Sequence, residues 1–168
     1  MTRKELKEIM PMHYIQKAKS NKPRNYKEDN AQGKFISDFK EKWPGVHIRR
    51  DGAGNNKTHW QRNQQQKQNS GRGFPDIMIF ASRDGFGACL IESKREGVNP
   101  ILKNGNLSAQ HHFRTQYQVH LELRAEGYYV MFASGEAELS YIADQYMNGT
   151  PVPMPTVDNF VYYPELDF

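Results

Sequence analysis

Residues 73–94 read GFPDIMIFASRDGFGACLIESK, and this stretch decides the fold class. It holds two short apolar runs, residues 76–81 and 86–92, on either side of Asp84-Gly85. Asp-Gly between two such runs is a strong signal for a β-hairpin, because both residues tolerate the positive φ angles of a tight turn. The runs are almost continuously apolar, which predicts strands that are covered on both faces of the sheet.

This hairpin is expected to bring three charged side chains together. Pairing centred on Asp84 sets residues whose numbers add up to 168 opposite each other, so Asp76 lies across from Glu92. Directly paired residues share a face of the sheet, and so do residues two apart on one strand, which adds Lys94. Two carboxylates and an ammonium on one surface are either a plain ion-pair cluster or the ligands and the cation of a hydrolytic Mg²⁺ site.

Helical and extended patterns alternate along the rest of the chain. Helices are expected at residues 2–18, 28–42, 108–127 and 136–147, and strands at 46–50, 76–81, 86–92 and 128–133. Apolar spacing, turn residues and capping residues set these bounds; Ser108, for example, is a candidate N-cap. The order α, α, β, β, β, α, β, α predicts one α/β domain with a central mixed sheet flanked by helices.

The expected domain spans residues 28–148. A helix and a basic linker, residues 1–27, precede it, and a tail, residues 149–168, follows it. Within the domain, residues 51–73 contain only Ala53 and Trp60 as apolar residues, which predicts a long mobile loop. Such a loop is either functional or an insertion without a role.

Composition excludes several classes of protein. The 168 residues have a mean hydropathy of −0.87 and contain no stretch near the ~20 apolar residues that a membrane-spanning helix needs. The start of the chain has no apolar segment typical of a signal peptide, and Cys89 is the only cysteine, which excludes an internal disulfide. The cytoplasm is therefore the expected compartment.

The net charge of +4 hides an asymmetry. Residues 1–74 hold 17 Lys and Arg against 7 Asp and Glu, whereas residues 75–168 hold 6 against 12. A basic half is typical of a protein that binds a polyanion, although a solvated surface has the same composition. The candidate nucleic-acid contacts are Arg49, Arg50, Lys57, Arg62, Lys67 and Arg72, with Trp60 available to stack on a base or sugar.

Four pieces of the sequence together resemble the PD-(D/E)xK nucleases, specifically the virus-type replication-repair nuclease (VRR-Nuc) branch, with the Holliday-junction resolvases as relatives. The resemblance runs from about residue 28 to residue 133. The pieces are Glu28-x-x-x-Gln32, Gly73-Phe74-Pro75-Asp76, Ile91-Glu92-Ser93-Lys94 and Gln116-x-x-x-His120-x-x-Leu123-x-x-x-Gly127.

The resemblance implies a restriction-endonuclease-like core and a phosphodiesterase that uses one or two metal ions. By it, the carboxylates of Asp76 and Glu92 and the carbonyl of Ser93 would hold Mg²⁺, for which Mn²⁺ could substitute. Lys94 would position the attacking water, and Glu28 would complete the outer metal shell or a second site. Cleavage would leave 5′-phosphate and 3′-hydroxyl ends.

Two residues of the long helix expected at 108–127 complete this set. Gln116 would contact the water or the scissile phosphate, unless it is a solvated helix residue. His120, one turn later, would pack or contact a phosphate of the nucleic acid. For Glu28, the alternative is a carboxylate that stabilises the positive end of the helix dipole.

The function implied is a metal-dependent DNA endonuclease, selective for branched, flap or junction DNA, in phage replication, recombination or repair. Its compartment would be the cytoplasm of a bacterial or phage-infected cell. The resemblance also implies a homodimer and a replication or recombination protein as partner. The alternatives are a sequence-specific restriction-type endonuclease and a nucleic-acid-binding module that keeps the fold without cutting.

Overall fold

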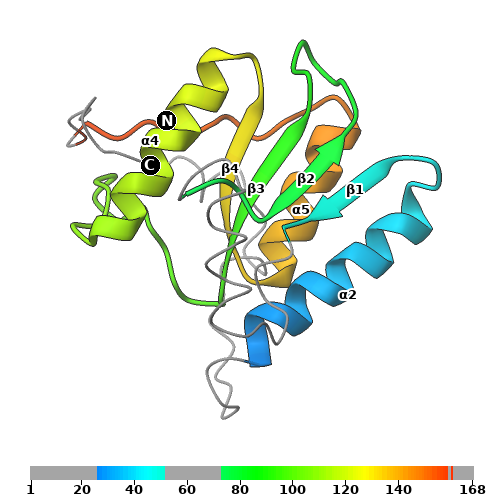
Figure 1. Ribbon diagram of the computed structural model, residues 1–168, viewed down its shortest axis with the longest axis horizontal. Coiled ribbons are helices and arrows are strands. Elements are labelled where there is room, and N and C mark those ends of the chain that lie inside the picture. The colour runs from blue at the N-terminus through cyan, green and yellow to red at the C-terminus, as the bar shows by residue number, and fades with distance from the viewer. Residues whose placement is uncertain (1–25, 52–72, 159, 161–168) are drawn as a thin grey trace, which may run out of the picture.

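The computed structural model describes residues 26–51, 73–158 and 160. The first expected helix, residues 2–18, and residues 52–72 of the expected loop lie outside this range. Within it, a mixed sheet forms the centre of an α/β domain, as predicted (Figure 1).

Four strands lie in the order β1-β2-β3-β4. β1 (His47–Arg50), β2 (Ile77–Phe80) and β3 (Cys89–Lys94) pair antiparallel in turn, and β4 (Tyr129–Ser134) runs parallel to β3. Parallel neighbours need a long crossover, and the segment between β3 and β4 provides it.

Three helices flank the sheet: α2 (Tyr26–Lys42), α4 (His111–Ala125) and α5 (Glu136–Met147). The bounds of α5 match the prediction, whereas α4 begins three residues after the predicted start at Ser108. Ser108 instead belongs to the preceding loop, because its N–H donates to the carbonyl of Pro100 at 2.8 Å. No helix in the described part of the chain is long and apolar enough to span a membrane.

The hairpin has the predicted Asp84-Gly85 turn and the predicted register, but a bulge that was not predicted lies between them. The strands pair Ile77 with Ile91 and Ile79 with Cys89, so the paired numbers add up to 168. The turn itself is the two-residue Asp84-Gly85, with φ of 48° and 82°. Three residues, 80–82, then face only two residues, 87–88, between the turn and the ladder. This bulge shifts the pairing by one residue.

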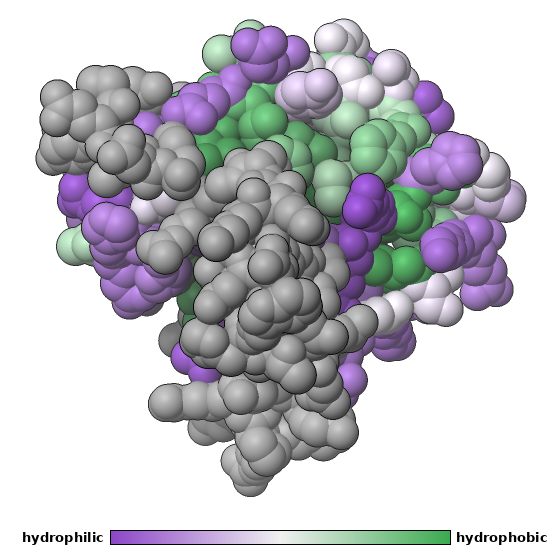
Figure 2. Space-filling view, viewed as in Figure 1, coloured by the Kyte–Doolittle hydropathy of each residue, from purple (hydrophilic) through white to green (hydrophobic). Residues whose placement is uncertain are grey.

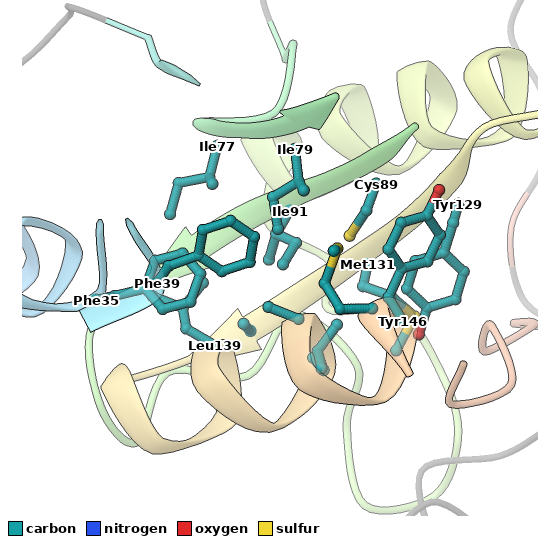
Figure 3. Packing of buried hydrophobic residues seen from close by; sticks show 14 of the residues in the cluster. Phe35, Phe39, Ile77, Ile79, Cys89, Ile91, Tyr129, Met131, Leu139 and Tyr146 are labelled. Carbon is teal, nitrogen blue, oxygen red and sulfur yellow. The ribbon is translucent and has the colours of Figure 1, made fainter. Parts of the chain in front are cut away.

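The two faces of the sheet have different covers. On the face that we call the core face, Ile77, Ile79 and Ile91 are fully buried beneath α2 and α5 (Figure 3). Tyr129 of β4 stacks on Tyr146 of α5, with ring centroids 5.3 Å apart. The buried members of this cluster are Phe35, Phe39, Ile77, Ile79, Cys89, Ile91, Tyr129, Met131, Ala133, Leu139, Ile142, Ala143, Tyr146, Met147 and Val152.

The opposite face, which we call the α4 face, is covered only in part. It carries the residues of β2 and β3 that alternate with the core residues, and α4 packs over its β3–β4 side through Phe113, Tyr117 and Phe132. On its β1–β2 side, Phe80 is 53% exposed. The prediction that both hairpin strands are covered on both faces is therefore correct for β3 and wrong for β2.

The segment after α5 packs along the domain. Residues 150–158 contain no helix or strand, as expected for an extended tail, but Val152 is buried in the core. The Tyr129 hydroxyl donates to the carbonyl of Val152 at 2.7 Å, and Arg124 donates to that of Pro155 at 2.8 Å. The extended segment therefore helps to close the core beside β4.

Candidate active site

The start of β2 and the end of β3 position the two candidate carboxylates. Continuing the observed register by one residue beyond Ile77 and Ile91 sets Asp76 opposite Glu92. The N–H of Ser93 donates to Oδ2 of Asp76 at 3.1 Å, which fixes the carboxylate against β3. The Asp76 side chain is partly exposed, so it faces the solvent from the rim of the site.

Glu92 is the centre of the cluster. It is 2% exposed, and its Oε1 accepts hydrogen bonds from Nζ of Lys94, at 2.5 Å, and from Nε2 of Gln116. Lys94 lies two residues along β3 on the same face, and its ammonium also lies 5.8 Å from the ring centroid of Phe113. Two donors and an aromatic ring thus hold the buried charges in a defined arrangement.

Gln116 reaches this centre from α4. Its Oε1 is buried and has no hydrogen-bond partner among the described residues. A buried carbonyl oxygen without a partner is uncommon in folded proteins and calls for an explanation. A cation or water in the site would satisfy it.

A close approach between Gly73 and α4 sets the distance between these elements. Gly73 has φ of 98°, and a Cβ at this position would lie 3.2 Å from the Cα of Gln116. Only glycine allows both the backbone angle and the contact. Gly73 belongs to the Gly73-Phe74-Pro75-Asp76 piece of the resemblance, but its place there does not predict the contact with α4.

The oxygen donors of the site suit a hard divalent cation. The described residues offer the carboxylates of Asp76 and Glu92, the carbonyl of Ser93 and the unpartnered Oε1 of Gln116. Among the described residues, no three His, Cys, Asp or Glu side chains form a group that could hold a metal ion. Glu28 lies in the first turn of α2, and its side chain is outside the described part of the chain.

Asp51 is a further carboxylate next to the site. Its N–H donates to the carbonyl of Asp76 at 2.7 Å, which continues the β1–β2 pairing by one residue. Directly paired residues share a face, so Asp51 belongs to the same side of the sheet as Asp76. Periodicity could have found this residue, because it follows the strand expected at residues 46–50.

Two histidines lie at the start of α4. His111 and His112 are exposed in its first turn, which contains no acidic residue. Partial desolvation, followed by repulsion from Lys94 and His111, lowers the pKa of His112 and so favours its neutral form. The next residue, Phe113, has its ring centroid 5.8 Å from Nζ of Lys94, which places the start of α4 beside the polar cluster.

His120 lies in the interior. It is 0% exposed, and its ring packs against that of Phe132 with centroids 4.2 Å apart and planes tilted by 33°. Burial, then the charges of Arg124 and Lys94, hold its pKa well below the usual value, so the ring is neutral at pH 7. This position fits packing, one of the two roles expected for His120, and it does not fit contact with nucleic acid.

The candidate nucleic-acid residues are separated by the structure. Arg49 pairs with Met78 and is exposed on the α4 face, whereas Arg50 pairs with Ile77 and belongs to the core face. The other five candidates lie outside the described residues: Lys57, Trp60, Arg62, Lys67 and Arg72.

No family model matches the sequence, and no curated protein matches it. The fold resembles that of a solved VRR_NUC domain protein. The similarity covers 80% of this chain and 100% of that one, with a TM-score of 0.55 and 18% sequence identity.

At this identity, the likeness to the VRR_NUC domain protein concerns the fold. It supports the arrangement of sheet and helices that brings Asp76, Glu92, Lys94 and Gln116 together. The chemistry of these residues rests on their own geometry.

Proposed function

We propose that this protein is a metal-dependent nuclease that hydrolyses DNA phosphodiester bonds at the cluster of Asp76, Glu92, Lys94 and Gln116. The observation that carries the proposal is that Lys94 and Gln116 both donate to the buried carboxylate of Glu92, while the Asp76 carboxylate is fixed beside it by the N–H of Ser93. The fold likeness to a VRR_NUC domain protein supports it, because that protein is named for a nuclease domain.

Stability alone does not explain such a cluster. Removing two charges from water costs several kcal/mol per ion, and buried ion pairs often contribute less than apolar residues of the same volume. Glu92 and Lys94 have side-chain exposures of 3% and 13%, in a strand that is otherwise apolar. Charged groups that are retained at such a cost are typical of functional sites.

The roles follow from the positions of the residues. Asp76 and Glu92, with Ser93 and Glu28, would hold Mg²⁺ or Mn²⁺. When bound, such an ion supplies Lewis-acid polarisation of the phosphate and a lower pKa for a bound water.

Lys94 and Gln116 would act on the reacting groups. The Lys94 ammonium orients the attacking water and offsets the charge that grows on the phosphate oxygens. The water oxygen forms the new bond to phosphorus as its proton leaves to solvent, the P–O3′ bond breaks, and the 3′ oxygen takes up a proton. Gln116 holds the water or the phosphate from α4.

The first test is cleavage of supercoiled, single-stranded and four-way-junction DNA with Mg²⁺ or Mn²⁺. Glu92→Gln is expected to lower the cleavage rate by about 10³-fold or more, because it removes the central charge while keeping the shape. Glu126→Gln, an exposed change at the end of α4, is the matched control and should cut like wild type.

A second measurement tests metal binding without turnover. Mn²⁺ should raise the Tm of the wild-type protein, because a ligand that binds only the folded state stabilises it. The rise should disappear in Asp76→Asn. If both Glu92→Gln and Lys94→Ala cut DNA at the wild-type rate, the chemistry takes place elsewhere. If Mn²⁺ does not change the Tm of the wild-type protein, a non-cleaving nucleic-acid-binding module is favoured.

The choice of DNA remains part of the proposal. Reproducible discrete bands from a long plasmid would favour a sequence-specific restriction-type enzyme, whereas preference for junctions or flaps would favour a structure-selective one. The homodimer and the replication or recombination partner stay predictions, which light scattering and binding assays would test.

A further inference from the structure

The uncovered part of the α4 face carries an apolar and basic surface. Phe80 is 53% exposed at the end of β2 and pairs with His47, and the partly exposed Met78 pairs with Arg49. His47 and Arg49 are exposed as well. We call these four residues the strand track. Figure 2 shows hydrophobic and hydrophilic atoms side by side at the right of the view, where Figure 1 places β1 and β2.

The strand track is continuous with the candidate active site. Asp76, Met78 and Phe80 alternate along one side of the chain, because successive residues of a strand point to opposite faces. At about 3.3 Å per residue, Phe80 lies roughly 13 Å from Asp76 along the strand.

The bulge next to Phe80 is a second special feature of this surface. Beyond Ile79, residues 80–82 face only two residues of the partner strand, and the N–H of Ala81 donates to the carbonyl of Ile79 at 3.1 Å. Bulges of this kind redirect side chains and are frequent beside active sites. A single exposed Phe is common in proteins, but this one lies at a bulge and in line with Asp76.

We propose that the strand track binds an unpaired DNA strand that leads into the active site, with Phe80 stacking on a base and Arg49 contacting a phosphate. This inference rests on the proposed nuclease function. Aromatic rings stack on bases of any sequence, but only where the bases are unstacked from a duplex. The exposed cation beside the apolar pair favours a polyanion over an apolar protein partner.

Fluorescence anisotropy in EDTA, with labelled single-stranded and blunt duplex oligonucleotides, tests this proposal without cleavage. Phe80→Ala should weaken single-strand binding roughly five- to 100-fold and leave duplex binding within about twofold. Phe80→Trp should restore binding, and its fluorescence should be quenched by the single strand. Arg49→Gln should weaken both substrates and reduce the salt dependence of binding.

Leu102 provides the matched control, because among the described residues it is the other large hydrophobic side chain that is exposed, at 43%. Leu102→Ala should bind both oligonucleotides like wild type. Equal loss for single strand and duplex in Phe80→Ala, or no loss for either, would overturn the proposal. A wild-type dimer that becomes a monomer in Phe80→Ala, with unchanged DNA binding, would instead identify the surface as a contact between two copies.

Failure of this proposal and failure of the nuclease function give different results. If wild type cuts DNA, Glu92→Gln does not, and Phe80→Ala cuts single strands and flaps as fast as wild type, only the strand track is wrong. If no DNA is cut or bound by wild type, the nuclease function is wrong, and the strand track fails with it.

Discussion

Ile91 and Glu92 are neighbours on β3, yet they belong to different surroundings. Ile91 is fully buried on the core face among the apolar side chains of α2 and α5. Glu92 is buried on the α4 face, where Lys94 and Gln116 donate hydrogen bonds to it. The core face holds the fold together through apolar burial, whereas the α4 face positions charges whose burial opposes folding. One strand thus contributes to the core on one side and carries the proposed active site on the other.

The two faces of the sheet also differ in how completely the helices cover them. Helices α2 and α5 are tied together across the core face by Lys42, which donates to Asp144 at 2.7 Å, and by Trp43, which donates to the same carboxylate at 3.3 Å. The α4 face keeps its β1–β2 side exposed at Phe80 and Arg49. The polar cluster therefore lies on the face of the sheet that the described residues leave partly open.

Substituting Ile91 and Glu92 separately tests this division and has the largest expected effects. Ile91→Ala should lower the free energy of unfolding by about 2–5 kcal/mol, because it leaves a cavity in the core. Glu92→Gln should lower it by less and abolish cleavage. Urea denaturation measures the first effect, and DNA cleavage below the unfolding midpoint measures the second.

The division between the two faces would be contradicted if the two substitutions had the opposite effects. If folded Ile91→Ala loses cleavage as completely as Glu92→Gln, or if Glu92→Gln is the less stable variant, the two faces do not divide stability and chemistry in this way.

A substitution at Gly73 is expected to have a smaller effect. Gly73 lies close to the backbone of α4, and this approach helps to position the helix beside the hairpin. Gly73→Ala should cost about 1–3 kcal/mol of stability and should also slow cleavage, since the new Cβ pushes against the backbone at Gln116. Gly149→Ala is the matched control: its φ is also positive, at 75°, but nothing lies within 4 Å of the added Cβ. Thermal unfolding and cleavage rates of both variants separate backbone strain from the contact.

Cleavage should be unchanged in Gly149→Ala. If both variants cut at the same rate, the approach of Gly73 to α4 has no part in placing Gln116.

Much of this fold could be predicted from apolar spacing and turn residues. The strands, the mixed sheet and the bounds of α5 follow from such patterns, because burial and local conformation impose them. The predicted register of the hairpin was correct, but it depends on a bulge that the sequence does not show. A two-residue turn at Asp84-Gly85 alone would set Asp76 opposite Ser93, and the bulge at residues 80–82 restores the pairing with Glu92.

The less predictable features depend on tertiary contacts. Ser108 has the chemistry of an N-cap, but its N–H is bonded to Pro100, so α4 starts later. The complete burial of His120 depends on how α4 packs over β4, which helical spacing does not determine. Residue types and spacing therefore predicted the members of the cluster better than the surroundings of each member.

The smallest expected effect concerns the neutral His120 beneath α4. Its pKa is held well below 6.5 in the folded protein by burial, so a proton binds more readily to the unfolded chain. The contribution of neutral His120 to the free energy of unfolding is therefore fully present above pH 6.5. It decreases as the pH falls toward the lowered pKa of the folded state. The contribution of this one group has a slope of up to about 1.4 kcal/mol per pH unit. His120→Leu should reduce the pH dependence of the unfolding free energy between about pH 6.5 and 5. Urea denaturation at four or five pH values measures these slopes, and equal slopes in wild type and His120→Leu would show that His120 is not buried as a neutral ring.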